Sequence, residues 1–322
     1  MLSDEVIKPE NFAHVPEFLD ALSSDRDNER WAKPYPQKLK NQYTGWIFRG
    51  HADSRWELIP IVLRTGTILE YVLPVKRVPL SNNKEQISAE YRLIDKFRHF
   101  LNELGLYIPE DSQEFHTKKI ESIKKFIKSI SEGKEAWPPD KCLSLVALAQ
   151  HHRIPTRLLD WTRDPYVAAY FAAKEAAEWI VGEKKPPKEG VETLSIWALN
   201  TFFLDANREM IKRQVITVTA PAYGNPNLHA QKGLFTLERL QSFSPEGTVC
   251  QDTLDKRIKD IIKVNNKLLL PLPIMRKLTI PINASREILR RLSYRFINAG
   301  TLYPGFDGAA EALKEQRLWD KT

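Results

Sequence analysis

The residues best suited to chemistry gather behind an apolar run in the middle of the chain. Two adjacent histidines, His151 and His152, precede Thr156, Asp160 and Trp161. A histidine can transfer a proton near neutral pH, and a carboxylate can stabilise a developing positive charge. Because neighbouring residues of a helix point in different directions, the two histidines cannot hold one metal ion as an i, i+4 pair does. We therefore expect a polar binding site without a metal.

The same stretch also allows a purely structural interpretation. Asp160 could form an ion pair with Arg153, Arg157 or Arg163, and Trp161 could pack beneath that pair. A histidine at the end of a helix can equally be a polar residue with its hydrogen bonds satisfied. Sequence alone leaves both interpretations open.

A second candidate is Arg49, in the motif FRGH at residues 48–51. It stands at the end of a predicted strand, where a planar guanidinium suits bidentate binding of a phosphate or carboxylate. Gly50 would let a ligand or a neighbouring backbone come close. A structural ion pair is the alternative for this arginine.

A third candidate is Gln231, in a loop that leads through Gly233 into a predicted strand carrying Phe235. A glutamine at such an entrance can donate or accept a hydrogen bond from a ribose or an amide. It could as easily cap the strand. The nearest acid on that strand is Glu238.

Local signals define the elements around the central motif. A buried helix that begins at Lys141 must end before Pro155, because the residue before a proline avoids helical geometry. The next dozen residues predict a turn and a short extended piece at one edge of the core. Asp164 and Pro165 then begin a second helix as its N-cap and first residue, and Gly182 ends it.

The rest of the chain mixes helices and strands without strict alternation, which predicts an α+β fold. One helix is expected from an N-cap at Ser88 to a stop at Gly105, and the helix near the C-terminus should end at Gly300. The expected strands cover residues 46–50, 193–200, 215–220, 233–240 and 278–282, and the further helices cover 114–131, 284–299 and 307–319.

Size and composition describe an ordinary folded protein. The chain has 322 residues, of which 42% are hydrophobic, and a net charge of +7. No apolar run is long enough for a membrane span, and the first residues do not form a secretory signal. The two cysteines, Cys142 and Cys250, fit a reduced, cytoplasmic protein. The basic surface could bind a polyanion or a phosphate-bearing molecule, or be merely basic.

These motifs together resemble the FRG domain family. The motif that names the family stands at residues 48–50. Residues 150–172 resemble its long signature, which consists of histidines, the sequence PTRLLDWT and a helix with the pattern A-x-x-F-A. AQKGLF at 230–235 and TLYPGFDG at 301–308 resemble two further family motifs. The resemblance implies one domain over residues 1–322 with a helical insertion at about 85–140. Arg153 departs from the family pattern, which usually has glycine there.

The FRG motifs in turn resemble those of ADP-ribosyltransferases of the arginine-serine-glutamate type. This likeness implies a mixed, mainly antiparallel sheet of that type, with C-terminal helices, and NAD as substrate. Arg49 would hold the diphosphate, and His152 or Thr156 would lie near the nicotinamide. Gln231 would occupy the region of the catalytic glutamate, so Glu238 or Asp160 would have to supply a carboxylate. The residues implied in NAD binding are Arg49, Gly50, His51, His151, Arg157, Asp160, Trp161, Gly233 and Phe235.

The resemblance leads us to expect an NAD-consuming enzyme, a mono-ADP-ribosyltransferase or NAD glycohydrolase that acts as a bacterial toxin or in anti-phage defence. Its acceptor would be a protein or a nucleic acid, and a partner protein could regulate it. We expect no membrane association. The alternative is a non-catalytic module that binds nucleic acid or a protein through its basic surface, motivated by the charge of +7 and by the missing catalytic glutamate.

Overall fold

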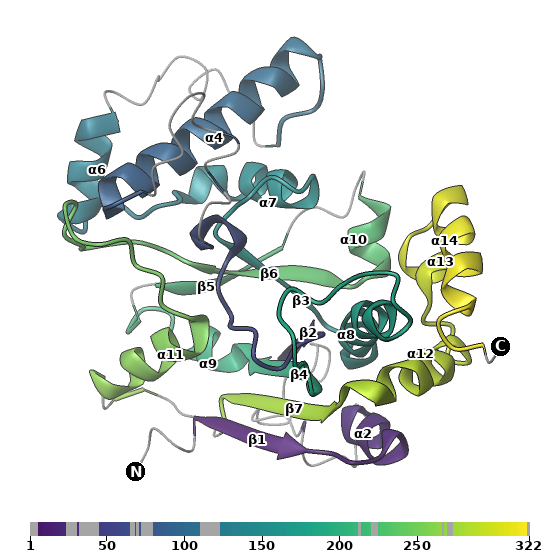
Figure 1. Cartoon of the computed structure of the whole chain (residues 1–322). Coiled ribbons are helices and arrows are strands. Elements are labelled where there is room, and N and C mark those ends of the chain that lie inside the picture. The colour runs from purple at the N-terminus through teal and green to yellow at the C-terminus, as the bar shows by residue number, and fades with distance from the viewer. Residues whose placement is uncertain are drawn as a thin grey trace, which may run out of the picture.

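A seven-stranded sheet lies at the centre of the computed structural model (Figure 1). The structure describes residues 6–23, 31, 45–64, 68, 71, 80–109, 123–211, 214–219, 225–265, 267–268 and 273–320. Its strands are β1 (Ile7–Asn11), β2 (Trp46–His51), β3 (Leu158–Thr162), β4 (Thr193–Asn200), β5 (Val215–Val218), β6 (Gly233–Glu238) and β7 (Met275–Pro281), in the spatial order β1-β7-β4-β2-β3-β6-β5. β1 pairs with β7 in parallel, and every other pair of neighbours is antiparallel. The predicted α+β class with a mixed, mainly antiparallel sheet is therefore confirmed.

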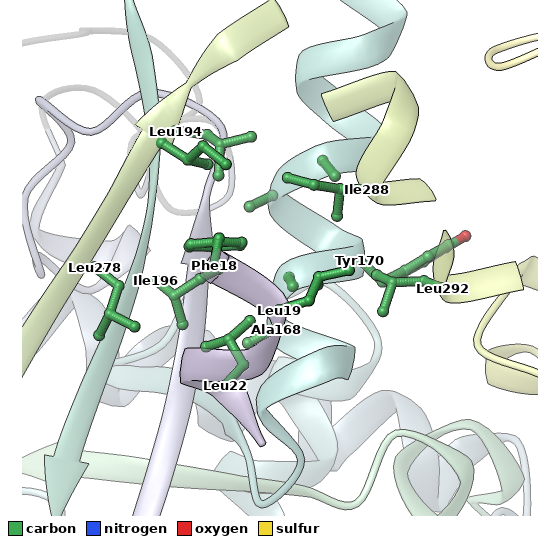
Figure 2. Packing of buried hydrophobic residues seen from close by; sticks show 14 of the residues in the cluster. Phe18, Leu19, Leu22, Ala168, Tyr170, Leu194, Ile196, Leu278, Ile288 and Leu292 are labelled. Carbon is green, nitrogen blue, oxygen red and sulfur yellow. The ribbon is translucent and has the colours of Figure 1, made fainter. Parts of the chain in front are cut away.

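Three helices cover one face of the sheet over β2, β4 and β7. They are α2 (Val15–Leu22), α8 (Pro165–Ile180) and α12 (Ser285–Ser293). Figure 2 shows Phe18 and Leu22 from α2, Ala168 from α8 and Ile196 from β4 meeting in this core. As predicted, Asp164 caps α8, and its carboxylate accepts a hydrogen bond from the amide of Tyr166 at 3.0 Å. The alanines of α8 leave little side chain between this helix and the strands, so the two approach closely.

The strands β3, β6 and β5 have a separate core on the same face. There α7 (Leu143–His151) and α4 (Asn83–Glu103) pack on Leu158, Phe235 and Leu237. On the opposite face, α9 (Thr201–Ala206) and α11 (Leu254–Lys263) cover a core that spans both halves of the sheet and includes Leu159 and Trp161. Side chains of β3 thus enter cores on both faces, as expected of an interior strand. The predicted short extended piece is present as β3, but its expected place at the edge of the core was wrong, because β3 lies between β2 and β6.

Two helix boundaries also differ from those predicted. Helix α4 begins six residues earlier than expected, since Asn82 is its N-cap and accepts a hydrogen bond from the amide of Glu85. Ser88 instead donates its hydroxyl back to the carbonyl of Lys84 within the helix. Near the C-terminus, α12 ends at Ser293, because Phe296 adopts a left-handed φ of 58° and turns the chain.

The remaining helices complete the outer layer. Gly300, predicted to end the preceding helix, lies inside the short α13. The helix expected at 114–131 appears as α6 from residue 123, and its earlier part falls outside the described residues. None of the described helices combines the length and the apolar character that a membrane span requires. These helices are α6 (Ile123–Ser131), α10 (Pro226–Ala230), α13 (Ala299–Leu302) and α14 (Phe306–Gln316).

Candidate functional site

The candidate site begins where two neighbouring strands separate. Over their described residues, β2 and β3 pair at Phe48 and Thr162 alone. Beyond this pair the side chain of Arg49 crosses the gap, and its Nη1 donates a hydrogen bond to the backbone carbonyl of Asp160 at 2.8 Å. The same Nη1 lies 3.5 Å from the Asp160 carboxylate oxygen Oδ2. An arginine therefore bridges the two strands where their backbone ladder stops.

A pocket of about 320 Å³ opens at this separation, between β2, β3, α8, α10 and β6. Its walls are mostly apolar and aromatic, with the polar side chains of Arg49, Asp160, Thr162 and Gln231 among them. The described residues that line it are Phe48, Arg49, Gly50, Asp160, Trp161, Thr162, Ala168, Phe171, Leu228, Gln231, Gly233, Leu234 and Phe235. An apolar hollow with a few polar groups is the usual form of a small-molecule site.

Gly50 and Gly233 bring the walls of the pocket together. A Cβ atom on Gly50 would lie 2.0 Å from the carbonyl oxygen of Ala168 in α8. A Cβ atom on Gly233 would lie 2.4 Å from a methyl carbon of Leu228 in α10. At Gly50 the neighbour is backbone, so only glycine permits the observed contact between strand and helix, whereas at Gly233 the neighbour is the end of a side chain that would have to shift.

Arg49 is fixed by His51 as well as by Asp160. Its Nε donates a hydrogen bond to His51 Nε2 at 3.0 Å. Burial, and then the positive charge of Arg49, lowers the pKa of His51 from 6.5 to about 3, so the imidazole is neutral and can accept this bond. His51 is only 2% exposed and does not line the pocket. It therefore acts on the site through Arg49.

Asp160 is the one carboxylate among the described residues that line the pocket. Its side chain is 60% exposed at the pocket mouth. Its Oδ2 accepts a hydrogen bond from Gln150 Nε2 at 3.0 Å. This acid and Arg49 are the two charged groups that a bound molecule would meet.

Gln231, in the loop before β6, and Phe235, within β6, both line the pocket. The side-chain nitrogen of Gln231 donates to the carbonyl of Leu302 at 3.2 Å, and its backbone carbonyl accepts a bond from the hydroxyl of Thr162 at 2.7 Å. Trp161 also lines the pocket, but its indole nitrogen donates to Thr236 in the core at 2.8 Å.

Several residues predicted for the site lie elsewhere. Arg157 is buried between α4 and α7, and its Nε donates to the carboxylate of Glu90 at 2.7 Å. Glu238 lies three residues along β6 from the pocket-lining Phe235 and forms an ion pair with Arg257 of α11 at 2.5 Å. Both are thus engaged in structural ion pairs, whereas Asp160 pairs with Arg49, which was not among the partners expected from the sequence.

The histidine pair and Thr156 also lie outside the pocket wall. The rings of His151 and His152 contact each other edge to face, 5.2 Å apart, at the end of α7. Burial, and then the neighbouring His152, lowers the pKa of His151. Thr156 is buried and donates its hydroxyl to Gln150. Arg153, at the position where the family usually has glycine, has a left-handed φ of 63°.

Sequence reasoning missed Phe171, Leu228 and Gln150. Phe171 lies in the A-x-x-F-A helix, whose phenylalanine could have been placed on the strand-facing side by its spacing from the alanines. Leu228 and Gln150 gave no separate signal, because their roles depend on contacts with Gly233 and Asp160. Within the described part of the chain, no group of three or more histidine, cysteine, aspartate or glutamate residues could hold a metal ion.

A comparison with protein families gives a match over part of the chain. Residues 44–179 match the family model of the FRG domain, a range that runs from just before β2 almost to the end of α8. The pocket walls contributed by α10 and β6 lie beyond this range. Neither the curated proteins nor the solved structures gave a match to the chain.

Proposed function

Because this chain contains an FRG domain over residues 44–179, we propose that its pocket binds NAD and that the protein consumes NAD as an ADP-ribosyltransferase or NAD glycohydrolase. We also propose that the separating strands make this a sheet of the ADP-ribosyltransferase type. One observation carries the proposal: Arg49 is held by its neighbours at the mouth of a pocket with aromatic walls.

The contacts of Arg49 leave part of its guanidinium for a ligand. Nε is bound to His51 and Nη1 to Asp160, whereas Nη2 makes no hydrogen bond within the described residues. A fixed guanidinium with free N–H groups is well suited to a phosphate oxygen. Since its position is already set, binding would cost little side-chain entropy.

The size of the pocket fits one end of a dinucleotide. At about 320 Å³ it lies near the lower limit of small-molecule sites, so it would take a ring and its ribose and leave the phosphates at the mouth. Phe171 and Phe235 offer the aromatic faces against which a nicotinamide ring could stack. Arg49 stands at the edge of this space, where the diphosphate would lie.

In the proposed reaction the bond between the ribose carbon C1′ and the nicotinamide nitrogen breaks, and nicotinamide leaves with the electron pair. The oxocarbenium-like centre that results would be stabilised by the Asp160 carboxylate, the pocket's acid in the described structure. Water or a hydroxyl, amine or carboxylate of an acceptor then bonds to C1′, and any proton it loses passes to solvent. Glu238 takes no part, because it is paired with Arg257.

The proposal is tested by measuring NAD binding calorimetrically and nicotinamide release chromatographically for the wild type and Arg49→Lys. Lysine keeps the positive charge but lacks the planar guanidinium, whose Nε and Nη1 bond to His51 and Asp160. We expect weaker binding and slower release, whereas Arg291→Lys, a matched change in an exposed i, i+4 pair of α12, should leave both unchanged. Absence of NAD binding by the wild type, or equal binding by Arg49→Lys, contradicts the proposal.

A second candidate, non-catalytic binding of single-stranded nucleic acid, is favoured by one surface feature. Tyr294 and Phe296 are 74% and 79% exposed, and they flank Arg295 at the end of α12. Exposed aromatic rings beside a cation suit base stacking. Binding to labelled oligonucleotides that weakens with salt and is lost in a Tyr294→Ser, Phe296→Ser variant would support this function. Equal binding by that variant would exclude this surface as the site.

A further inference from the structure

Gln150, in the last turn of α7, connects three segments that meet behind the pocket. Its Oε1 accepts a hydrogen bond from the hydroxyl of Thr156 at 2.8 Å, and its Nε2 donates to Asp160 Oδ2 at 3.0 Å. The Thr156 oxygen also accepts a bond from the amide of Leu158 at 3.1 Å. Because the Asp160 carboxylate can only accept, the nitrogen of the Gln150 amide faces it, and the amide oxygen is left to accept from the Thr156 hydroxyl.

The end of α7 holds Gln150 in this place. The amide of Arg153 donates to the carbonyl of Gln150 at 3.0 Å, and the amide of Ile154 donates to the carbonyl of Ala149 at the same distance. Together with the left-handed φ of Arg153, these bonds close the helix and turn the chain toward β3. The side chain of Gln150 is half-buried and leaves the last turn beside the strand that carries Asp160.

We infer that Gln150 is a positioning residue, which sets the direction of the Asp160 carboxylate and, through it, of the Arg49 guanidinium. Hydrogen bonds link Thr156 to Gln150 and Gln150 to the Asp160 carboxylate, whose Oδ2 lies 3.5 Å from Arg49 Nη1, and Arg49 Nε donates to His51. Gln150 does not line the pocket and would not touch a ligand there. Its role in NAD binding rests on the proposed function, whereas its effect on Arg49 does not.

The test replaces the amide by an isosteric carboxylate. Gln150→Glu removes the donor toward Asp160 and places two carboxylates against each other, while the oxygen that accepts from Thr156 is kept. The matched control is Gln241→Glu, since Gln241 Nε2 also donates to an oxygen, the carbonyl of Gly133, far from the pocket. Adding Asp160→Asn to Gln150→Glu restores the hydrogen bond in the opposite direction, with the amide at position 160 as donor and the carboxylate at position 150 as acceptor.

Two readouts separate the inference from the proposed function. In the ligand-free protein, NMR measures the exchange of the Arg49 Nε–H proton with water, and calorimetry then measures the binding of inorganic pyrophosphate. For Gln150→Glu we expect faster exchange of that proton and pyrophosphate binding weakened on the order of tenfold or more, as the loss of a charge-assisted contact requires. The reversed pair should return the exchange rate toward the wild-type value.

Each outcome has a distinct meaning. Exchange of the Arg49 proton that is the same in Gln150→Glu and the wild type overturns the inference, whatever the protein binds. Altered exchange without any binding of pyrophosphate or NAD by the wild type supports the role of Gln150 and overturns the proposed function. An equal effect of Gln241→Glu would show a general loss of structure and also overturns the inference.

Discussion

Replacing His51 by glutamine tests how the protein holds its pocket arginine. Burial, followed by the positive charges of Arg49, Arg64 and Lys277, lowers the pKa of His51 from 6.5 to about 3. Between these two values the unfolded chain takes up a proton that the folded protein excludes. The free energy of unfolding should therefore fall as the pH drops from 6.5 toward 3, and His51 should cost nothing above that window.

The size of the effect follows from the two pKa values. At about 1.36 kcal/mol per pKa unit, the complete shift amounts to about 5 kcal/mol, of which about 3 kcal/mol is lost by pH 4. Because the His51 side chain is almost completely buried, solvent does little to reduce this cost. A loss of that size is a large part of the stability of an ordinary domain.

Glutamine is the appropriate replacement, because its carbonyl oxygen can take the place of Nε2 and accept the bond from Arg49 without titrating. Urea unfolding at pH 7 and pH 4 gives the free energy of unfolding of each variant. The wild type should lose about 3 kcal/mol more than His51→Gln between the two pH values. The control is His99→Gln, at a side chain that is 65% exposed, and its loss should equal that of the wild type. A wild-type loss equal to that of His51→Gln would refute the reasoning from burial.

Three further changes test the packing around the site. Arg157→Leu leaves the Glu90 carboxylate buried without its cation. In urea titrations this change should lower the free energy of unfolding by about 3–5 kcal/mol, and a loss below about 1 kcal/mol would contradict a buried ion pair. Gly50→Ala places a methyl group against the carbonyl of Ala168 and should lower that free energy by about 1–3 kcal/mol, and an unchanged melting temperature would show that α8 moves aside freely. Arg153→Gly should raise the free energy of unfolding by about 1 kcal/mol, because glycine adopts the left-handed φ without strain. A destabilised variant would show that the contacts of the arginine side chain stabilise the fold by more than this strain costs.

The elements that depend on local signals could be predicted from the sequence. Asp164 followed by Pro165 begins a helix through its own side chain and ring, so the start of α8 was confirmed. Ser88 was a wrong choice of N-cap, because a serine inside a helix can bond its own backbone equally well. The actual N-cap, Asn82, is also set by a local contact, the hydrogen bond that its side chain accepts from the amide of Glu85.

The candidate site could be predicted only in part, because it is assembled from distant segments. Arg49 and Gln231 lie 182 positions apart in the printed sequence, yet both line one pocket. Which acid would accompany them could not be read from spacing. Glu238 is paired with Arg257 of α11, whereas Asp160 reaches the pocket because β2 and β3 separate beside it.

The single pairing between β2 and β3 makes this the seam of the described sheet with the fewest paired backbone positions. On one face the two halves of the sheet have separate cores, one under α8 and one under α7, while on the other face they share the core that includes Ile47 and Trp161. Besides this pair, the halves are joined at the pocket by the contacts of Arg49, by the ion pair of Lys232 with Asp164 and by the bond from Gln231 to Leu302. The pocket lies along this seam, so any change in how the halves meet would change the width of the space for a ligand.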